Sequence, residues 1–362
     1  MDDLGIGGRL TLPTDLAGTI RGPADLLSGR CANVPESEEK IAAVVVTYDR
    51  KDLLGECLDS LLGQSFPPDA LYIIDNHSTD GTYESLLAKE LISPIESASN
   101  EPAESVRPVT GLPGRRLEVR YVRMPENTGG AGGFHEGMKR AVDTGFDWLW
   151  VMDDDLLAAP DALEVLVRKK EGLEAAGDGS FLLNSLVLSK GHANQDRLAF
   201  PLQELSAGGS PKIGVYHWRL SEVRDRVHDG LYRWICPFNG TLIPARVIRE
   251  IGLPNSEFFI KGDEKDFLWR AAGRFNLYTV VDSRVFHPQP QNDAFDWKQY
   301  YQIRNMLIVN RHFRFTVLRN LKLIVVGLLW GLRHGRPGLA LVLRAIRDGL
   351  ARRLGKRGDL SA

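Results

Sequence analysis

Three adjacent carboxylates, Asp153, Asp154 and Asp155, end an apolar segment that is typical of a buried strand. Alternate side chains of an extended segment face the same way, so Asp153 and Asp155 can share one ligand. Neighbouring carboxylates repel one another unless a cation neutralises them, and oxygen ligands suit Mg²⁺ or Mn²⁺. The pattern predicts a divalent-cation site, and a solvated acidic turn is the alternative.

A second acidic pair, Asp263 and Glu264, lies in the segment FFIKGDEKDF at 258–267. Repulsion between two neighbouring carboxylates raises the pKa of one of them toward the range of a general base. The pair is therefore a candidate for proton transfer. His287, in the segment VFHP, can add an imidazole to the metal site, although a lone histidine is more often structural.

Residues suited to a nucleotide lie at the ends of other predicted elements. Asp75 and Asn76 end the strand expected at 70–76, where a carboxylate can accept from a ribose hydroxyl or a uracil N–H. The glycine-rich segment NTGGAGGF, at 127–134, opens a predicted helix whose free backbone N–H groups favour phosphate. The segment does not match G-x-x-x-x-G-K-[ST], which excludes a P-loop ATPase, whereas a Rossmann-type dinucleotide site stays open.

An open, largely parallel α/β sheet is the fold that brings such strand ends together. Residues 93–116 predict an exposed loop, and residues 181–240 predict a less regular second layer on the side where a second substrate would bind. Strands are expected at 41–48, 70–76, 117–124 and 147–155, and helices at 51–63, after the glycine-rich segment to about Asp143, and after Pro160.

The composition is that of a globular protein in a reducing compartment. Of the 362 residues, 43% are hydrophobic and 25% are charged. The cysteines Cys31, Cys57 and Cys236 form no C-x-x-C pair, which argues against a disulfide framework and a zinc site. The first residues lack the apolar core of a secretory signal. The sequence contains no run of about 18 apolar residues, so no membrane-spanning helix is expected.

The C-terminal part of the chain is strongly basic. Between Arg311 and Arg357 twelve Lys and Arg residues face a single acid, Asp348, so the other residues sum to −13, from 33 bases and 46 acids. The apolar stretch 321–332 is too short to cross a bilayer and is followed by a second one at 338–354. Cationic helices of this kind bind anionic membrane surfaces, and a pair of core or oligomer helices is the alternative.

The ordered set of motifs resembles family 2 inverting glycosyltransferases with the GT-A fold, a Rossmann-like open mixed sheet flanked by helices. These motifs are VVVTYDR, IIDNHSTDG, NTGGAGGF, WVMDDD, FNGTLIP, FFIKGDEKDF, VFHP and YYQIRN, and they cover roughly residues 40–310. Within the family, NTGGAGGFHEGM and RLAFPL (197–202) look most like bacterial galactofuranosyltransferases. The resemblance divides the chain into an extension at 1–38, a catalytic domain at 39–310 and membrane-associating helices at 311–362.

The resemblance implies transfer of galactofuranose from UDP-galactofuranose to a cell-envelope or polyprenyl-linked glycan, with Mn²⁺ or Mg²⁺, on the inner face of the plasma membrane. A rhamnosyl- or other hexosyltransferase using a dTDP- or UDP-sugar is the nearest alternative. A nucleotidyltransferase and a non-catalytic sugar-nucleotide or lipid-binding module are alternatives from other classes. No nucleic-acid partner is expected, and an oligomer is possible.

The resemblance also assigns roles to single residues. Asp153, Asp155 and His287 would bind the cation. Glu264 would be the general base and Asp263 would orient the acceptor, with the base assignment open between the two. The nucleotide sugar would contact Thr47, Tyr48, Arg50, Asp75, Asn76, Gly129, Gly130 and Asp154. The acceptor would contact Trp234, Phe238, Asn239 and Gly240.

Overall fold

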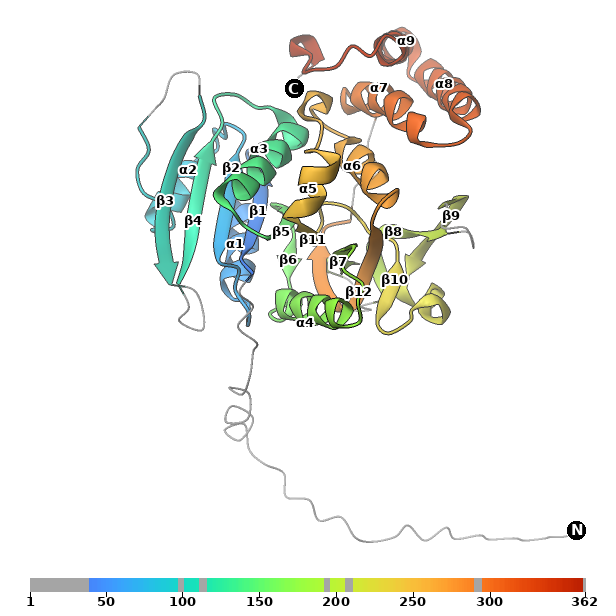
Figure 1. Ribbon diagram of the computed structural model, residues 1–362. Helices are drawn as coiled ribbons and strands as arrows, with labels where there is room; N and C mark the ends of the chain where they lie inside the picture. Colours follow the sequence, from blue (N-terminus) through green and yellow to red (C-terminus); the bar gives the residue numbers. More distant parts are fainter. Residues whose placement is uncertain are drawn as a thin grey trace, which may run out of the picture. The chain divides into compact units, whose positions relative to one another are not determined.

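The computed structural model describes residues 39–96, 101–110, 116–191, 196–205, 211–289 and 295–360. The expected N-terminal extension, 1–38, lies outside the described residues. The chain from Glu39 onward forms one compact unit by itself, built on a mixed sheet flanked by helices (Figure 1). The predicted α/β class, with an open mixed sheet, is confirmed.

Four parallel strands form one half of the sheet. β1 lies between β2 and β5, β4 continues the sheet beyond β2, and β3 closes that edge in the antiparallel direction. The central strands are apolar on both faces and β-branched, which suits a strand buried between two layers of helices. The bounds are β1 Ile41–Thr47, β2 Ala70–Asp75, β3 Ala103–Thr110, β4 Arg116–Arg123 and β5 Trp148–Asp153.

The other half of the sheet is mixed. β11 pairs antiparallel with both β5 and β7, so β7 runs in the direction of β5, and β12 pairs parallel with β7. The carboxyl ends of β5 and β12 therefore share one edge of the sheet. The bounds are β6 Leu157–Ala158, β7 Phe181–Ser189, β8 Arg197–Leu205, β9 Pro211–Arg219, β10 Leu231–Arg233, β11 Thr241–Pro244 and β12 Asn276–His287.

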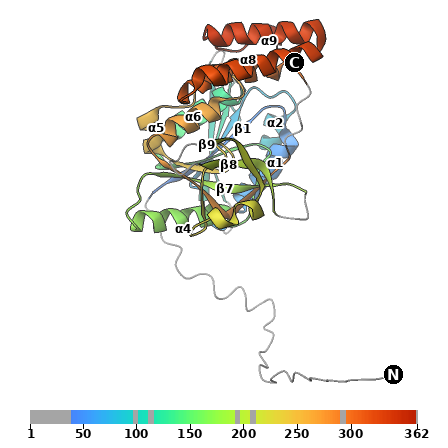
Figure 2. The same ribbon diagram turned by 90° about the vertical axis from the view of Figure 1, so that its right-hand side faces the viewer.

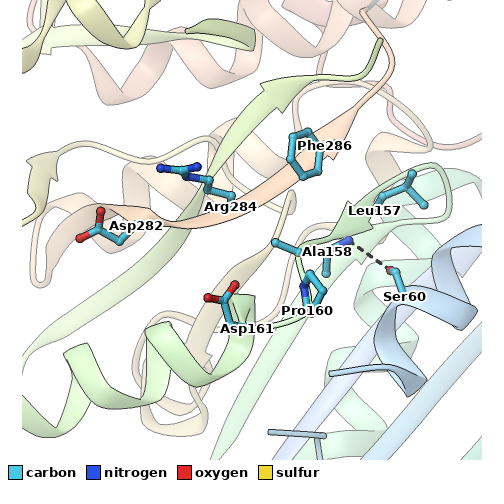
Figure 3. A pocket seen from close by; sticks show the side chains of 9 residues that line it. Ser60, Leu157, Ala158, Pro160, Asp161, Asp282, Arg284 and Phe286 are labelled. Carbon is cyan, nitrogen blue, oxygen red and sulfur yellow. Dashed lines mark hydrogen bonds between the residues drawn. The ribbon is translucent and has the colours of Figure 1, made fainter. Parts of the chain in front are cut away.

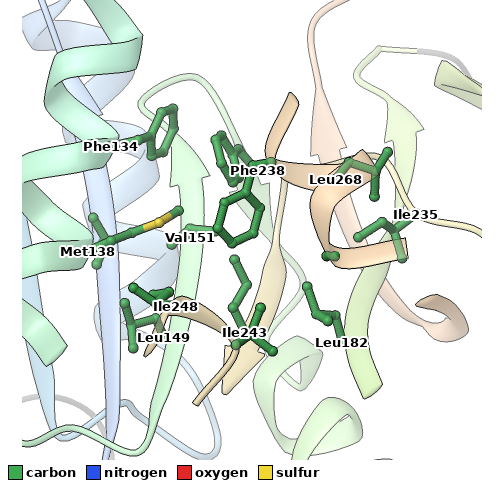
Figure 4. Close-up of a cluster of buried hydrophobic side chains, with 14 of the residues drawn as sticks. Phe134, Met138, Leu149, Val151, Leu182, Ile235, Phe238, Ile243, Ile248 and Leu268 are labelled. Carbon is green, nitrogen blue, oxygen red and sulfur yellow. The ribbon is translucent and has the colours of Figure 1, made fainter. Parts of the chain in front are cut away.

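Alternate side chains of β1 pack into two hydrophobic clusters on opposite faces of the sheet. Ala42, Val44 and Val46 face α3, α5 and α6, and Ile41 and Val45 face α1, α2 and α4. Figure 4 shows the first cluster, in which helix α3 and strand β5 contribute side chains to one buried group. The bounds are α1 Lys51–Leu62, α2 Thr82–Ala88, α3 Gly129–Thr144, α4 Ala162–Ala175, α5 Ala245–Ile251 and α6 Asp263–Ala272.

The C-terminal helices α7, α8 and α9 pack together, and α8 and α9 lie side by side in both views (Figures 1 and 2). Among the described residues, none of the helices has the length and apolar character needed to cross a bilayer. The bounds are α7 Lys298–Val309, α8 Thr316–Arg333 and α9 Gly335–Leu350. Short 3₁₀ turns occupy Leu220–Glu222, Arg224–Arg226, Ser256–Phe258, Asn310–His312 and Gly358–Leu360.

Two segments differ from the sequence-based expectation. The predicted loop 93–116 contains β3, an edge strand whose proline and charged residues hide its pattern, because an edge strand needs only one hydrogen-bonded neighbour. The predicted second layer 181–240 contributes β7, a fully buried strand, to the main sheet. Its partners β11 and β12 lie far along the chain, so local sequence does not reveal this pairing.

Candidate active site

The ends of β1 and β5 meet where the direction of the chain through the sheet reverses. From β1 the chain continues to β2 on one side and later returns to β5 on the other, with Val46 opposite Asp153. Open α/β sheets bind ligands outside the carboxyl ends of strands at such a point. The acidic segment therefore lies where the topology favours a ligand.

Asp153, Asp155 and His287 come together at this edge. One ligand atom from each lies within 4.8 Å of the others. The His287 Nε2 is 2.9 Å from the Asp155 Oδ1, and its Nδ1 is 2.5 Å from the Pro288 carbonyl oxygen. A carbonyl only accepts, so Nδ1 carries the proton and Nε2 is the atom presented to a ligand. Two carboxylates and one imidazole form a donor set that fits Mg²⁺ or Mn²⁺.

The charges of the cluster shift the pKa values of its members. Burial, followed by the charge of Asp155, raises the pKa of Asp153 to about 7. Burial also acts to raise the pKa of Asp155, but hydrogen bonding and the charge of His287 outweigh it and lower that pKa. Burial acts to lower the pKa of His287, and the same bond to Asp155 reverses the shift and raises it. Without a cation, the cluster therefore holds extra protons near neutral pH.

Asp154 fastens the end of β5 to the end of β1. Its Oδ2 accepts from the Thr47 hydroxyl at 2.7 Å, and its Oδ1 accepts from the Arg50 Nη1 at 3.2 Å. The same guanidinium contacts Asp155 Oδ2 at 3.0 Å. Burial raises the pKa of Asp154 to about 6, against the lowering effect of Arg50 and Thr47. These contacts use Thr47 and Asp154 internally and leave half of the Arg50 side chain exposed.

Asp75 and Asn76, expected at the nucleotide, are buried and bonded within the protein. The Asp75 carboxylate accepts from the Tyr121 hydroxyl at 2.6 Å and from the Ser78 N–H at 2.7 Å. Burial, then the charge of Asp75, raises the pKa of Tyr121, which therefore stays protonated and donates. Tyr48, by contrast, is exposed, and its contact with a nucleotide stays a prediction.

The glycine-rich segment has a packing role that its sequence does not reveal. Gly129 has φ +70°, and a Cβ there would lie 2.1 Å from the Phe259 carbonyl oxygen. That oxygen accepts from the Ala131 N–H at 3.0 Å, and Asn76 donates to the Gly129 carbonyl at 3.0 Å. At Gly130 a Cβ would meet nothing within 4 Å. The segment thus joins α3 closely to the loop before α6, and its use by phosphate stays a prediction.

The second acidic pair begins α6. Asp263 is buried, and its burial together with the neighbouring charge of Glu264 raises its pKa well above the usual value. Glu264 is more exposed, and its Oε2 accepts from the Gly262 N–H at 2.9 Å. Because Glu264 is the more exposed of the two carboxylates, it is the one more accessible to an acceptor hydroxyl, and its role as the base stays a prediction.

The two acidic clusters lie within electrostatic range of each other. The charge of Asp153 contributes to the raised pKa of Asp263. Burial raises the pKa of the Cys236 thiol, and the charges of Glu264 and Asp153 both add to this shift. Both clusters therefore lie near enough to Cys236 for their charges to act on its thiol, a proximity that no spacing in the sequence indicated.

The residues expected at the acceptor are largely buried. Phe238 lies in the core with its ring centroid 4.8 Å from that of Phe134, and Trp234 lies 5.2 Å from Trp269 (Figure 4 shows Phe238). Phe238 therefore offers an acceptor almost no surface in this structure. The remaining two expected residues, Asn239 and Gly240, follow in the same segment.

Asn239 and Gly240 differ in what they can offer an acceptor. The Asn239 Oδ1 is buried with no hydrogen-bond partner among the residues that the structure describes. Gly240 has φ +74°. Its N–H donates to the Val151 carbonyl, and its carbonyl accepts from the Ser185 N–H. The roles of both residues at an acceptor stay predictions.

A hollow of about 690 Å³ lies on the face of β12 opposite to His287 (Figure 3). Phe286 and Arg284 line it, and because alternate strand residues face opposite ways, His287 points away from it. The hollow is therefore separate from the acidic clusters. Its described lining is Ser60, Leu157, Ala158, Ala159, Pro160, Asp161, Asp282, Arg284 and Phe286.

Comparison with known proteins places this geometry in a family. The profile of "Glycosyl transferase family 2" matches residues 42–182. Galactofuranosyltransferase GlfT1 of Mycobacterium tuberculosis (strain ATCC 25618 / H37Rv) is 32% identical over 256 residues, which are 69% of this chain and 70% of the relative. The chain belongs to glycosyl transferase family 2. Within the family it is close to the galactofuranosyltransferases, and it is a glycosyltransferase enzyme.

Solved structures agree on the fold of this family 2 enzyme. A crystal structure of S. aureus TarS has a TM-score of 0.53 at 12% identity, covering 86% of this chain and 49%, about half, of the TarS chain. TarS 1–349 in complex with UDP-GlcNAc has a TM-score of 0.51 at 12% identity, covering 86% of this chain and 80% of that one.

Proposed function

We propose that this family 2 enzyme transfers galactofuranose from UDP-galactofuranose to a glycan acceptor, with inversion at the anomeric carbon. The observation that carries the proposal is the cluster of Asp153, Asp155 and His287 at the sheet edge. Glu264 lies in the acidic pair that is within electrostatic range of this cluster. The sugar is inferred from the galactofuranosyltransferase relatives. A cation site and a general base each assist direct displacement of a diphosphate.

Asp153, Asp155 and His287 would hold the divalent cation. When bound, Mn²⁺ or Mg²⁺ would offset the negative charge that develops on the departing diphosphate. The half-exposed guanidinium of Arg50 lies beside these carboxylates and is available to the same phosphates. Exposed Tyr48 offers a flat ring for the base of the nucleotide.

Glu264 would remove the proton from the acceptor hydroxyl. The acceptor oxygen then bonds to the anomeric carbon on the face opposite the leaving group, and the bond to the UDP oxygen breaks with its electron pair leaving on UDP. The configuration therefore inverts without a covalent enzyme intermediate. The Gly262 N–H bond to Glu264 Oε2 at 2.9 Å orients the carboxylate while its other oxygen can take the proton.

We also propose that α8 rests on an anionic membrane surface, where a polyprenyl-linked acceptor would be found. Its face toward α9 carries Gly327 and Gly331, at which a Cβ would lie 3.4 and 3.0 Å from Val342 side-chain atoms. Its outward face is apolar, which is the reverse of an ordinary surface helix. The exposed stripe, spaced at three or four residues, is Leu318, Leu321, Val325, Leu329 and Leu332.

Charge supports the lipid surface as the partner of this stripe. Asp348, the single acid between Arg311 and Arg357, is buried. Its carboxylate accepts from the Arg357 Nη2 at 2.7 Å and from the Tyr300 hydroxyl at 2.8 Å. The tail up to Arg357 therefore exposes cations and apolar groups together, as interfacial helices do.

A donor panel tests the proposed activity. The full chain would be incubated with Mn²⁺, a galactan or polyprenyl-linked acceptor and, in turn, UDP-galactofuranose, UDP-galactopyranose and dTDP-rhamnose. We expect nucleotide release with UDP-galactofuranose and a product of inverted anomeric configuration by NMR. Turnover of dTDP-rhamnose alone would reassign the donor, and a retained configuration would overturn the mechanism.

A further inference from the structure

The loop Glu257–Gly262, which leads into α6, has a strained backbone. Phe259 has φ 66° and ψ −71°, and the Ile260 N–H donates to the Phe258 carbonyl at 2.9 Å. These are the features of a three-residue γ-turn with positive φ, which is rare because it strains the chain. A residue other than glycine keeps such a conformation only where its surroundings hold it.

Two side chains of α7 hold this loop. The Asn305 Nδ2 donates to the carbonyl oxygens of Phe258, Ile260 and Lys261 at 3.1, 2.9 and 2.7 Å. The Arg304 Nη2 donates to the same Phe258 carbonyl at 2.9 Å. Both side chains are fully buried, so water does not compete for these carbonyls. Lys261 also lies in the left-handed region, at φ 64°.

The hydrogen bonds continue from the loop to the proposed base. Gly262 has φ 100°, and its N–H donates to the Glu264 Oε2 at 2.9 Å. The same loop also contacts α3, because the Phe259 carbonyl accepts from the Ala131 N–H. The position of the Glu264 carboxylate thus follows the backbone that Asn305 holds.

The segment after α9 closes the same loop from outside. The Gly355 N–H donates to the Glu257 carbonyl, and the Gly355 carbonyl accepts from the Arg304 Nη1, both at 2.7 Å. The Arg357 N–H donates to the Tyr301 hydroxyl of α7 at 2.8 Å. The C-terminal segment and the loop Glu257–Gly262 are therefore parts of one hydrogen-bonded network.

We propose that Arg304 and Asn305 are positioning residues for sugar transfer, holding the loop Glu257–Gly262 and, through the Gly262 N–H, the Glu264 carboxylate. Neither side chain touches substrate; both act through the loop carbonyls. The inference rests on the proposed role of Glu264 as the base.

Asn305→Ala in the full chain is the first test. We expect kcat to fall by about 100-fold, the scale of a small misplacement of a catalytic group, with KM for the donor nearly unchanged. Asn305→Asp keeps the acceptor for the Arg304 Nε but loses the donors to the loop carbonyls. If the alanine variant does not fold, Asn305→Asp should show the same fall in kcat. Asn310→Ala is the matched control, because Asn310 is also buried beside α7 but bonds to Asn320.

A double-mutant cycle with Glu264→Gln separates the positioning role from the proposed function. If Asn305 acts through Glu264, Asn305→Ala should add little loss in the Glu264→Gln background. Full additivity there, or an unchanged kcat in the Asn305 single variants, would overturn the positioning role while leaving the base intact. A fully active Glu264→Gln variant would instead overturn the base assignment, and the positioning role with it.

Discussion

The His287 Nε2 lies 2.9 Å from the Asp155 Oδ1, although their strands β12 and β5 are separated in the sheet by β7 and β11. The contact exists because two antiparallel pairings restore the direction of β12 to that of β5, so both strands end at one edge. It turns a sequence motif and a distant histidine into a single donor set for a cation.

Removing the imidazole should weaken metal binding. Loss of groups that only support metal ligands weakens affinity by about 10–100-fold, so His287→Ala should weaken Mn²⁺ binding at least that much. Chelation by EDTA should abolish turnover. His135→Ala is the control, since the His135 Nδ1 also contacts a prolyl carbonyl, that of Pro254. Calorimetric Mn²⁺ titration of the two variants gives the comparison, and equal affinities would remove His287 from the site.

The metal-free protein should lose stability as pH rises through about 7. The folded pKa values of Asp153, about 7, and Asp154, about 6, lie above the unfolded value, and that of His287 is raised as well. A group whose pKa is higher in the folded state than in the unfolded state stabilises the fold fully below its unfolded pKa. This stabilisation disappears as pH rises through the folded pKa. Excess Mn²⁺ should oppose the loss, because the deprotonated carboxylates are its ligands. Thermal unfolding across pH 5–9 with and without Mn²⁺ measures both effects; a Tm that rises with pH in EDTA would contradict the assignment.

Replacing the proposed base should lower turnover without affecting donor binding. Glu264→Gln keeps the shape and removes the proton acceptor, so kcat should fall by about 10²–10⁴-fold. Asp263→Asn should be milder, because Asp263 is buried and less accessible to an acceptor than Glu264. Steady-state kinetics decide between them: an inactive Asp263→Asn beside an active Glu264→Gln would exchange the two roles.

Alanine substitutions at the neighbouring residues Gly129 and Gly130 should change folding stability in opposite directions. Gly129→Ala places a Cβ 2.1 Å from the Phe259 carbonyl at positive φ, so it should destabilise the fold by at least about 1–3 kcal/mol. Gly130→Ala meets nothing within 4 Å in the first turn of α3 and should stabilise by about 0.5–1 kcal/mol. Urea unfolding of the two variants tests this, and equal effects would mean that close packing at Gly129 is unimportant.

Charging the outward face of α8 should weaken membrane binding. Each exposed leucine that enters the interface contributes about 1.5–3 kcal/mol, so Leu321→Glu with Leu329→Glu should reduce vesicle binding more than 10-fold. Val106→Glu is a matched control, because Val106 is an exposed apolar residue on the edge strand β3. Flotation with vesicles of anionic lipid measures binding, and added salt should weaken it. Unchanged flotation, with the leucine variant losing self-association in light scattering, would assign the face to a second copy of the chain.

The amino-acid sequence alone predicts the family, the α/β class and the strands on which the acidic motifs lie. Buried parallel strands read as continuous apolar runs, and polar residues at their carboxyl ends indicate a ligand, so β1, β2 and β5 and the acids after β5 were predictable. The ordered motifs also indicated the chemistry, because a cation and a base impose particular residue types.

Which side chains meet depends on tertiary packing, which the sequence does not reveal. Pairing of β12 with β7 brings His287 to Asp155, and packing of α7 brings Asn305 to the loop before Glu264. Packing also buries Phe238 in the core and uses Gly129 for a close approach. Such contacts depend on pairing between segments far apart in the chain, which local periodicity and motif spacing do not encode.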